Sequence, residues 1–240
     1  MDKVSIVIPT YNRLHYLLNT IKSVKEQTYQ AIEIIVVNDC STQEEYYTYD
    51  FQTFAPIQVI HLKENSRKVV GFPCAAYVRN QGINAATGKY IAFCDDDDIW
   101  FPTKIELQVQ AMNQTGCKMS CTDGLIGRGI YNPLKNYRKY NAEQYYPLLH
   151  RVYKSKRSSA LDAGFPSIWT LDFLKIHNCA ITSSVMITKD IIDSIQGMKH
   201  LKNGEEDYDC WLRALELTSC VYVKDVCFYY DLGHGAGQNY

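Results

Sequence analysis

The chain has 240 residues and a formal net charge of −1, and 46% of its residues are hydrophobic and 21% are charged. This composition is that of an ordinary globular protein, and the nearly neutral charge gives no overall electrostatic basis for binding nucleic acid or a membrane. No apolar stretch approaches the roughly 20 residues that a membrane-spanning helix needs.

The cysteines indicate the compartment in which the protein folds. There are nine, an odd number, and most lie within apolar runs, whereas a secreted disulfide framework favours an even count in a shorter chain. We therefore expect free thiols and a cytoplasmic location, with peripheral attachment to a membrane left open. The N-terminal apolar run covers only Val4–Ile8 before Pro9 ends it, so we expect no signal peptide.

Strands and helices alternate in the first part of the chain. The apolar runs Val4–Ile8, Ile32–Val37 and Tyr90–Cys94 are nearly continuous, which is typical of strands buried on both faces of a parallel sheet. A fourth apolar run predicts a strand over Ile57–Leu62. The helices are predicted over Ala75–Ala86 and over an apolar stripe made of Leu14, Leu17, Leu18, Ile21 and Val24. This alternation predicts a Rossmann-like, open and mostly parallel α/β sheet flanked by helices.

Less regular sequence follows. Asp95–Asp98 end the fourth strand, and Pro102 suits the first turn of the next helix. Residues 127–178 show no period, and residues 128–157 contain eight basic side chains against one acid, Glu143. We interpret this stretch as an irregular insertion or a substrate-facing region, with a solvated surface segment as the alternative. Further on we predict a strand over Ala180–Ile187, a helix from near Gly204, and strands over Cys220–Val226 and Cys227–Tyr230.

The run Asp95–Asp98 carries the first chemical signal. Two carboxylates 4 Å apart repel by about 1 kcal/mol in water and about 4 kcal/mol at an effective dielectric constant near 20, so four of them need a compensating cation. Mg²⁺ and Mn²⁺ prefer oxygen ligands, and Mg²⁺ is commonly shared between carboxylates and substrate phosphates. Ligands of open parallel sheets bind beyond the carboxyl ends of the strands. The run therefore indicates a metal beside a nucleotide diphosphate, and the alternative is an acidic turn with Asp98 capping the next helix.

Three other segments could contribute to a nucleotide site. The loop Pro9–Arg13 follows the first strand and offers backbone amides, an aromatic ring and a guanidinium. Asp39 follows the second strand and could accept a hydrogen bond from a pyrimidine base. Arg79, in the helix before the acidic run, could hold Asp95 or a phosphate. The alternative reading of the loop is an ordinary strand–helix connection, that of Asp39 is a turn residue, and that of Arg79 is a surface arginine.

The acids of segment 204–209 could supply a general base. They open a helix, where the macrodipole favours negative charge in any case. A carboxylate with an ordinary pKa is ionised at pH 7 and can accept a hydroxyl proton, and burial beside other acids would raise its pKa towards neutrality.

Together, in this order, the motifs resemble glycosyltransferase family 2, the large group with the GT-A fold. The segments that carry the resemblance are Pro9–Arg13, Val36–Thr42, Arg79–Gly82, Phe93–Trp100 and Glu206–Arg213. It is strong over residues 3–112, good over 180–215 and weak over 127–178. Two positions depart from the family pattern. Asn38 replaces the first of two usual aspartates, and Asp96 stands where a small residue is usual, which leaves open whether Asp96 or Asp97 is the principal metal ligand.

The resemblance implies a role for each candidate residue. Nucleotide binding would involve Pro9, Thr10, Tyr11, Arg13, Asp39, Arg79, Asp95 and Asp96. Mn²⁺ or Mg²⁺ would be held by Asp97, Asp95 and His234. Asp207 would be the catalytic base, and Glu206 and Trp211 would lie on the acceptor side. We expect a single GT-A domain over residues 1–240, with a nucleotide-sugar-binding half over 1–125 and an acceptor-side half over 126–240.

The implied activity is a metal-dependent, inverting transfer of a sugar from a nucleotide-sugar donor, with a UDP-sugar favoured, to an acceptor hydroxyl. The acceptor could be a carbohydrate, lipid-linked or protein molecule, and no nucleic acid is expected as a partner. A non-catalytic binding module on the same fold is the first alternative. A sugar-nucleotidyltransferase is disfavoured because no glycine-rich phosphate loop follows the first strand. The sequence leaves open the sugar, the oligomeric state and whether the chain is part of a longer protein.

Overall fold

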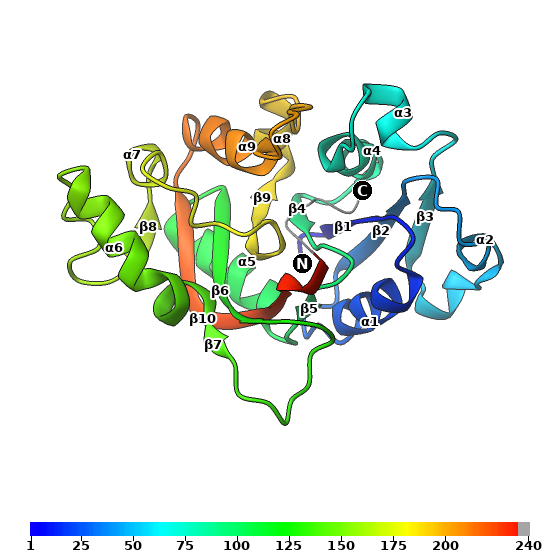
Figure 1. The fold of residues 1–240 in the computed structure, drawn as a ribbon, viewed down its shortest axis with the longest axis horizontal. Coiled ribbons are helices and arrows are strands. Elements are labelled where there is room, and N and C mark those ends of the chain that lie inside the picture. The colour runs from blue at the N-terminus through cyan, green and yellow to red at the C-terminus, as the bar shows by residue number, and fades with distance from the viewer. Residues whose placement is uncertain (235–240) are drawn as a thin grey trace.

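The computed structural model describes residues 1–234, apart from the side chain of His234. Figure 1 shows that the described residues form an α/β fold around one ten-stranded sheet. The first part of the chain contains β1 (Val4–Thr10), α1 (Leu14–Lys25), β2 (Ile32–Asn38), α2 (Glu45–Thr48), the 3₁₀ turn η1 (Phe51–Phe54), β3 (Ile57–His61), α3 (Ser66–Val70), α4 (Ala75–Ala85) and β4 (Tyr90–Phe93).

The second part contains more irregular elements. They are β5 (Ile99–Trp100), α5 (Lys104–Thr115), β6 (Met119–Gly127), β7 (Arg138–Lys139), the π-helical segment η2 (Tyr140–Tyr145), α6 (Tyr146–Ser155), β8 (Ile168–Trp169), α7 (Leu171–Leu174), the 3₁₀ turn η3 (Thr182–Ser184), β9 (Met186–Thr188), α8 (Lys189–Ser194), α9 (Glu206–Leu215), β10 (Cys220–Asp231) and the 3₁₀ turn η4 (Leu232–His234).

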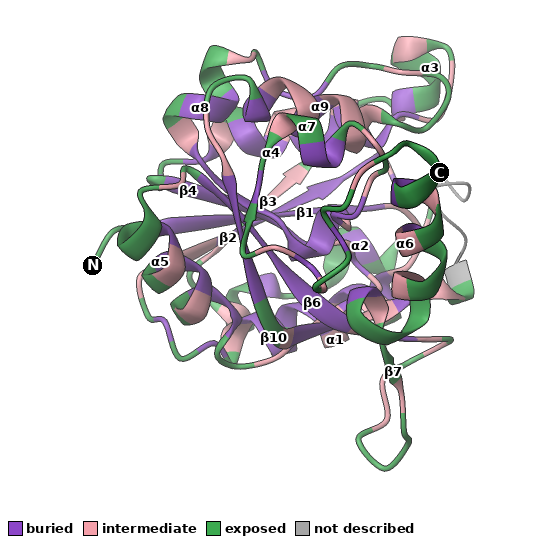
Figure 2. Cartoon of the chain, turned by 90° about the vertical axis from the view of Figure 1, so that its left-hand side faces the viewer, coloured by how far each residue is buried: buried purple, intermediate pink, exposed green. Residues whose placement is uncertain are grey.

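The first half of the sheet is parallel, as the sequence predicts. β1 pairs in parallel with β2 and β4, and β2 pairs in parallel with β3. Successive side chains of β1 face opposite sides: Val7 packs in the cluster that includes α4 and α9, while Ile6 and Ile8 pack in the cluster that includes α1 and α5. Figure 2 shows the buried strands running through the centre of the molecule. Burial on both faces explains why these strands read as continuous apolar runs.

The second half of the sheet is mixed, and here several predictions are wrong. Most of the run Ala180–Ile187 is not strand, because η3 occupies its middle and only the short β9 pairs, antiparallel to β4 and β6. The two strands predicted after Cys220 are one strand, β10, whose pairing with β6 shifts register on both sides of Val226. β6 itself lies between β9 and β10 and was not anticipated.

Residues 127–178 are more ordered than their lack of period predicts. They contain β7, η2, α6, β8 and α7, and α6 buries Leu149 and Tyr153 in the core. The sequence gives little signal for α6 because only two of its ten residues, Leu149 and Tyr153, are buried. In the part of the chain that the structure describes, no helix is long and apolar enough to cross a membrane.

Gly82 lets α4 approach the sheet closely. A Cβ atom at this position would lie 2.5 Å from Val7 Cγ1 and 3.2 Å from Val37 Cγ2, and the first of these distances is shorter than real contacts allow. Arg79 lies one helical turn before Gly82 on α4, so this close approach also sets how near Arg79 comes to the sheet.

We predict that Gly82→Ala lowers the free energy of unfolding by about 1–3 kcal/mol, as measured by urea denaturation, because overpacking outweighs the better helix propensity of alanine. Val7→Ala removes the crowding atoms. The double variant should therefore be more stable than the sum of the two single effects predicts. Simple additivity, or a stabilising Gly82→Ala, would contradict the close packing.

Candidate functional site

The four aspartates after β4 fall into two pairs with opposite surroundings. Asp96 and Asp98 are completely buried, whereas the side chains of Asp95 and Asp97 are 25% and 11% exposed. Only Asp95 and Asp97 can therefore present oxygen atoms to a ligand. The alternation follows from the turn after β4, in which Asp98 N donates to Asp95 O.

Asp96 supports the loop Pro9–Arg13 from beneath. Its carboxylate accepts a hydrogen bond from Thr10 Oγ1 at 2.6 Å and pairs with the Arg13 guanidinium at 2.5 Å. Burial raises the pKa of Asp96 to about 6, and the charge of Arg13 opposes that rise. The fully buried Asp96 and the fully buried Thr10 thus hold the loop from the inside, and their contact with a nucleotide stays a prediction.

Arg13 also reaches the more exposed acid. Its Nη1 atom lies 2.9 Å from Asp97 Oδ2, so one guanidinium bridges Asp96 and Asp97. Tyr46, from α2, holds this arrangement, because its hydroxyl lies 2.5 Å from Thr10 Oγ1 and accepts a hydrogen bond from Arg13 N. The repulsion within the acidic run is therefore relieved by an arginine of the neighbouring loop.

Arg79 joins the acidic run to α9. Its side chain is only 6% exposed, and it pairs with Asp95 at 2.6 Å and with Glu206 at 3.3 Å. Of the two partners that the sequence left open for this guanidinium, Asp95 and a phosphate, the structure shows the contact with Asp95. Because Glu206 begins α9, Arg79 of α4 pairs with a residue that lies 127 positions further along the chain.

Asp207 lies beside this pair in the first turn of α9. Thr182 Oγ1 donates to one carboxylate oxygen at 3.0 Å, and Tyr208 N donates to the other at 2.6 Å. Burial raises the pKa of Asp207 to about 6, with the positive charge of Arg79 opposing the rise and the negative charge of Glu206 adding to it. Such a carboxyl is ionised at neutral pH yet basic enough to accept a proton.

Asp39 anchors the segment that follows β3. Its buried carboxylate accepts hydrogen bonds from Ser66 N at 2.7 Å, Ser66 Oγ at 2.6 Å and Asn65 Nδ2 at 3.0 Å. Burial raises its pKa, and the bonds from Ser66 oppose that rise. The side chain therefore fixes the start of α3 next to the loop that follows β2.

Asn12 connects the loops after β1 and β2. Its backbone adopts a left-handed φ of 52°, a conformation that asparagine tolerates better than most residues. Its side-chain oxygen accepts from Thr42 N at 2.7 Å and from Gln43 N at 3.2 Å. These hydrogen bonds therefore hold the two loops together.

Trp211 and His234 are two further residues that the sequence predicts for the site. Trp211 is completely buried and packs against Phe93, with the ring centroids 5.5 Å apart. Its ring therefore supports α9 from the core and presents no surface to an acceptor. His234 ends η4, but its side chain lies outside the described part of the structure.

Several residues around the site could not have been selected from sequence. Thr182 and Ser183 interrupt an apolar run, and Ser183 Oγ accepts a hydrogen bond from Asp95 N at 2.9 Å. Asp231 N donates to Asp98 Oδ1 at 3.0 Å, which ties the end of β10 to the acidic run. The only available signal was a polar residue within an apolar segment, and such residues are common.

Among the described residues, no group of three or more His, Cys, Asp or Glu side chains is arranged to hold a metal ion. Asp95 and Asp97 offer two carboxylates, which is a donor set that Mg²⁺ commonly completes with phosphate and water. The residues present therefore fit an ion shared with a substrate better than an ion held by protein ligands alone.

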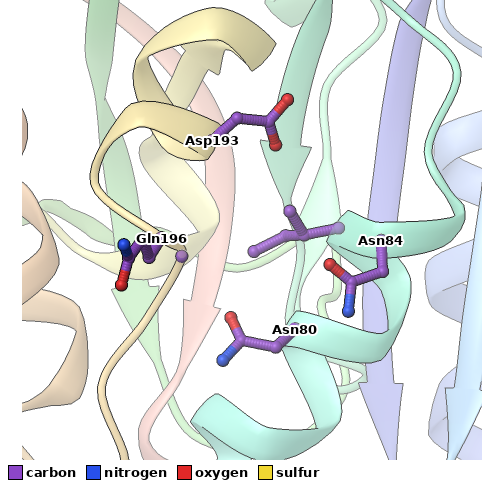
Figure 3. A pocket seen from close by; sticks show the side chains of 6 residues that line it. Asn80, Asn84, Asp193 and Gln196 are labelled. Carbon is purple, nitrogen blue, oxygen red and sulfur yellow. The ribbon is translucent and has the colours of Figure 1, made fainter.

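A surface pocket of about 300 Å³ lies away from these residues, between α4 and α8 (Figure 3). It is lined by Asn80, Ile83, Asn84, Asp193, Gln196 and Gly197. The Asn80 amide is already engaged, because it donates to Met198 O at 2.7 Å and accepts from Met198 N at 2.9 Å. The pocket contains none of the candidate site residues.

The fold is that of the GT-A glycosyltransferases. A structure of TarS residues 1–349 from S. aureus in complex with UDP-GlcNAc matches with a TM-score of 0.70 at 16% identity, covering 99% of this chain and 61% of the TarS chain in that structure. The mannosyltransferase PcManGT from Pyrobaculum calidifontis, in complex with GDP-Man and Mn²⁺, matches with a TM-score of 0.62 at 16% identity, covering 96% and 57%.

The family model of glycosyl transferase family 2 matches residues 5–169, and the chain belongs to this family of transferase enzymes. The putative teichuronic acid biosynthesis glycosyltransferase TuaG of Bacillus subtilis is 36% identical over 125 residues, which cover 50% of this chain and 45% of TuaG. WfaP of Escherichia coli, a UDP-Glc:alpha-D-GlcNAc-diphosphoundecaprenol beta-1,3-glucosyltransferase, is 39% identical over 113 residues, which cover 47% and 42%. This chain therefore spans less than two thirds of the length of these relatives.

We predict that Arg79→Gln lowers the free energy of unfolding by about 1–3 kcal/mol, measured by urea denaturation, because it leaves Asp95 and Glu206 without their shared cation. The exposed Arg151→Gln is the matched control and should change stability by less than about 0.5 kcal/mol. Equal effects of the two substitutions would show that the Arg79 contacts contribute little.

Proposed function

We propose that this chain is a metal-dependent, inverting glycosyltransferase that moves a sugar from a nucleotide-sugar donor, with a UDP-sugar favoured, to an acceptor hydroxyl. The observation that supports this most is the connection made by Arg79 between Asp95, at the end of β4, and Glu206, beside Asp207. It brings two partly exposed carboxylates, two arginines and a carboxyl with a pKa near 6 into one site.

The donor would bind in the first half of the chain, residues 1–125. The loop containing Pro9, Thr10, Tyr11 and Arg13 lies beside the acidic run, and the Asn12 contacts join it to the loop that carries Asp39. The guanidinium groups of Arg13 and Arg79 are suited to a diphosphate. TarS has been crystallised with UDP-GlcNAc, which supports a UDP-sugar as the donor class.

Mn²⁺ or Mg²⁺ would be held by Asp97 and Asp95, with His234 as a further candidate ligand. Such an ion would neutralise the charge that develops on the departing diphosphate. Asp96 and Asp98 are too deeply buried to share in this, so their part is to hold the loop and the turn.

Asp207 would act as the general base. With Thr182 and Tyr208 fixing both of its oxygens, the carboxylate would take the proton of the acceptor hydroxyl while that oxygen attacks the anomeric carbon. Attack from the face opposite the leaving group inverts the configuration. The acceptor would be approached from the second half of the chain, residues 126–240. The lipid-linked acceptor of WfaP supports a lipid-linked acceptor here over a carbohydrate or protein.

We predict that UDP raises the melting temperature, in a screen of UDP, GDP and dTDP, and that Mn²⁺ increases the shift. Asp97→Asn should remove most of the additional Mn²⁺ effect while the protein remains folded. The exposed Asp50, at the start of η1, provides the matched control variant Asp50→Asn. Equal UDP binding in Mn²⁺ and in EDTA would contradict the metal part of the proposal.

We predict that Asp207→Asn lowers sugar transfer by about 10²–10⁴-fold while leaving the UDP-induced thermal shift intact. In the wild type, kcat/KM should rise with pH through about 6, because the base becomes active as Asp207 loses its proton.

Thr182→Val refines the pH prediction. It removes a hydrogen bond that stabilises the ionised carboxylate, so the acidic limb of the profile should move to higher pH. The exposed Thr53→Val should leave the limb in place. Full transfer activity in folded Asp207→Asn would exclude this residue as the base, and UDP binding without turnover across a broad panel of donors and acceptors would favour a non-catalytic module.

A further inference from the structure

One segment of this chain has a large excess of basic over acidic residues. Residues 128–157 contain eight Lys and Arg side chains and one acid, which leaves seventeen basic and twenty-five acidic residues in the rest of the chain. The one acid, Glu143, accepts a hydrogen bond from the backbone of Lys139. A nearly neutral protein therefore carries a local basic surface.

The basic segment begins with a loop, residues 128–137, that projects from the molecule between β6 and β7 (Figures 1 and 2). Leu134, near its tip, is 93% exposed, and Ile130 is 47% exposed. Lys135 follows Leu134 directly and is also exposed. Fully exposed leucine at the tip of a projecting loop is unusual when the surrounding side chains are polar and basic.

The exposure of Leu134 is built into the loop. Lys135 N donates to Asn132 O at 3.0 Å and Leu134 N donates to Asn132 Oδ1 at 2.9 Å, and Pro133 occupies the second position of this turn, where proline is favoured. The turn therefore holds Leu134 outwards, where it has no core to enter.

The base of the loop is rigid. Tyr131, Tyr137 and Tyr229 form a cluster with ring centroids 4.9–5.6 Å apart, and the Tyr229 hydroxyl donates to Gly129 O at 2.8 Å. Asn132 N donates to the Tyr137 hydroxyl at 3.1 Å. Ordering of this kind costs conformational entropy, which favours a defined role for the projecting tip over an unstructured connection.

Helix α6 carries further exposed basic and apolar side chains close to the loop in the chain. η2 joins it to β7, and both views place the start of α6 next to β7. Its inner face buries Leu149 and Tyr153, while Leu148 is 47% exposed beside the exposed Arg151 and Lys154. Exposed leucine with flanking basic residues is therefore found both on the loop and on α6.

We propose that the loop 128–137 and the outer face of α6 dock on an anionic lipid bilayer, with Leu134 entering the headgroup region and the basic side chains contacting lipid phosphates. Interfacial segments combine apolar residues with Lys and Arg in this manner. An acidic polymer would use the charges but would gain nothing from exposed leucines, so the apolar tip favours a bilayer.

The position of the loop would bring the bilayer to the catalytic side. Gly129 N, at the loop's base, donates to Asp231 Oδ1 at 2.7 Å, and Asp231 N donates to Asp98 in the acidic run. One residue thus separates the base of the loop from the turn that carries Asp95 and Asp97. Membrane docking goes beyond sugar transfer and can be tested without any transfer activity.

The test is co-sedimentation of the purified chain with large unilamellar vesicles of phosphatidylcholine alone or with 30% phosphatidylglycerol. We expect binding to the anionic vesicles and its loss at high salt, because the surface attraction is screened. Lys135→Ser and Arg151→Ser should each weaken binding about fivefold, and Leu134→Ser about three- to tenfold.

Matched controls separate this surface from general charge and hydrophobicity. Lys22→Ser removes an exposed lysine from α1, and Leu217→Ser removes a leucine that is 55% exposed after α9. Neither should change vesicle binding. As a second readout, the emission of Leu134→Trp should shift to shorter wavelength on anionic vesicles, whereas that of Leu217→Trp should not.

Two results would contradict the membrane docking. Failure to bind anionic vesicles at low salt would overturn the proposal. It would also be overturned if soluble polyphosphate bound as tightly as the vesicles and Leu134→Ser weakened neither interaction, because the basic surface would then recognise polyanions. If the wild-type protein bound no UDP or transferred no sugar, that result would contradict the proposed function but not the membrane docking.

Discussion

The arrangement of the candidate site depends on how a buried cluster of negative charge is neutralised. Four consecutive aspartates follow β4, two of them completely buried, and such charges persist only when they are paired or protonated. Arg13 pairs with Asp96 and Asp97 and Arg79 pairs with Asp95, while burial raises the pKa of Asp98 well above its usual value, aided by the charges of Asp97 and Asp95. The loop after β1 and helix α4 are consequently held against the end of β4 by electrostatics.

Close packing makes these ion pairs attainable. α4 approaches β1 through Gly82, and Asn12 and Asp39 fasten the loops after β1 and β2 to their neighbours. These contacts lie outside the acidic run, yet they help to position α4 and the loops after β1 and β2, which lie next to the run. The site is therefore a product of the whole first half of the sheet.

The parallel half of the fold was predictable because its strands are buried on both faces and its helices have a clear apolar stripe. β6 was missed because its sequence, Met119–Gly127, mixes Ser, Thr, Asp and Gly with apolar residues. Its Asp123 accepts hydrogen bonds from the backbone N–H groups of Asn141 and Ala142, which lie 18 and 19 positions away. The order of the site motifs was sufficient to recognise the family. The division of labour among Asp95–Asp98 was not predictable, because it is decided by burial and by arginines that lie 84 and 16 residues away.

The double attachment of Arg79 has a thermodynamic consequence. The same guanidinium neutralises Asp95 and lowers the pKa of Asp207, so any ligand that draws Arg79 towards or away from Asp95 changes the proton affinity of Asp207. Linkage is reciprocal, and the protonation state of Asp207 must alter the affinity for that ligand by the same factor. Ligand binding near Asp95 and the basicity of Asp207 are therefore coupled through the Arg79 side chain, without any change of fold.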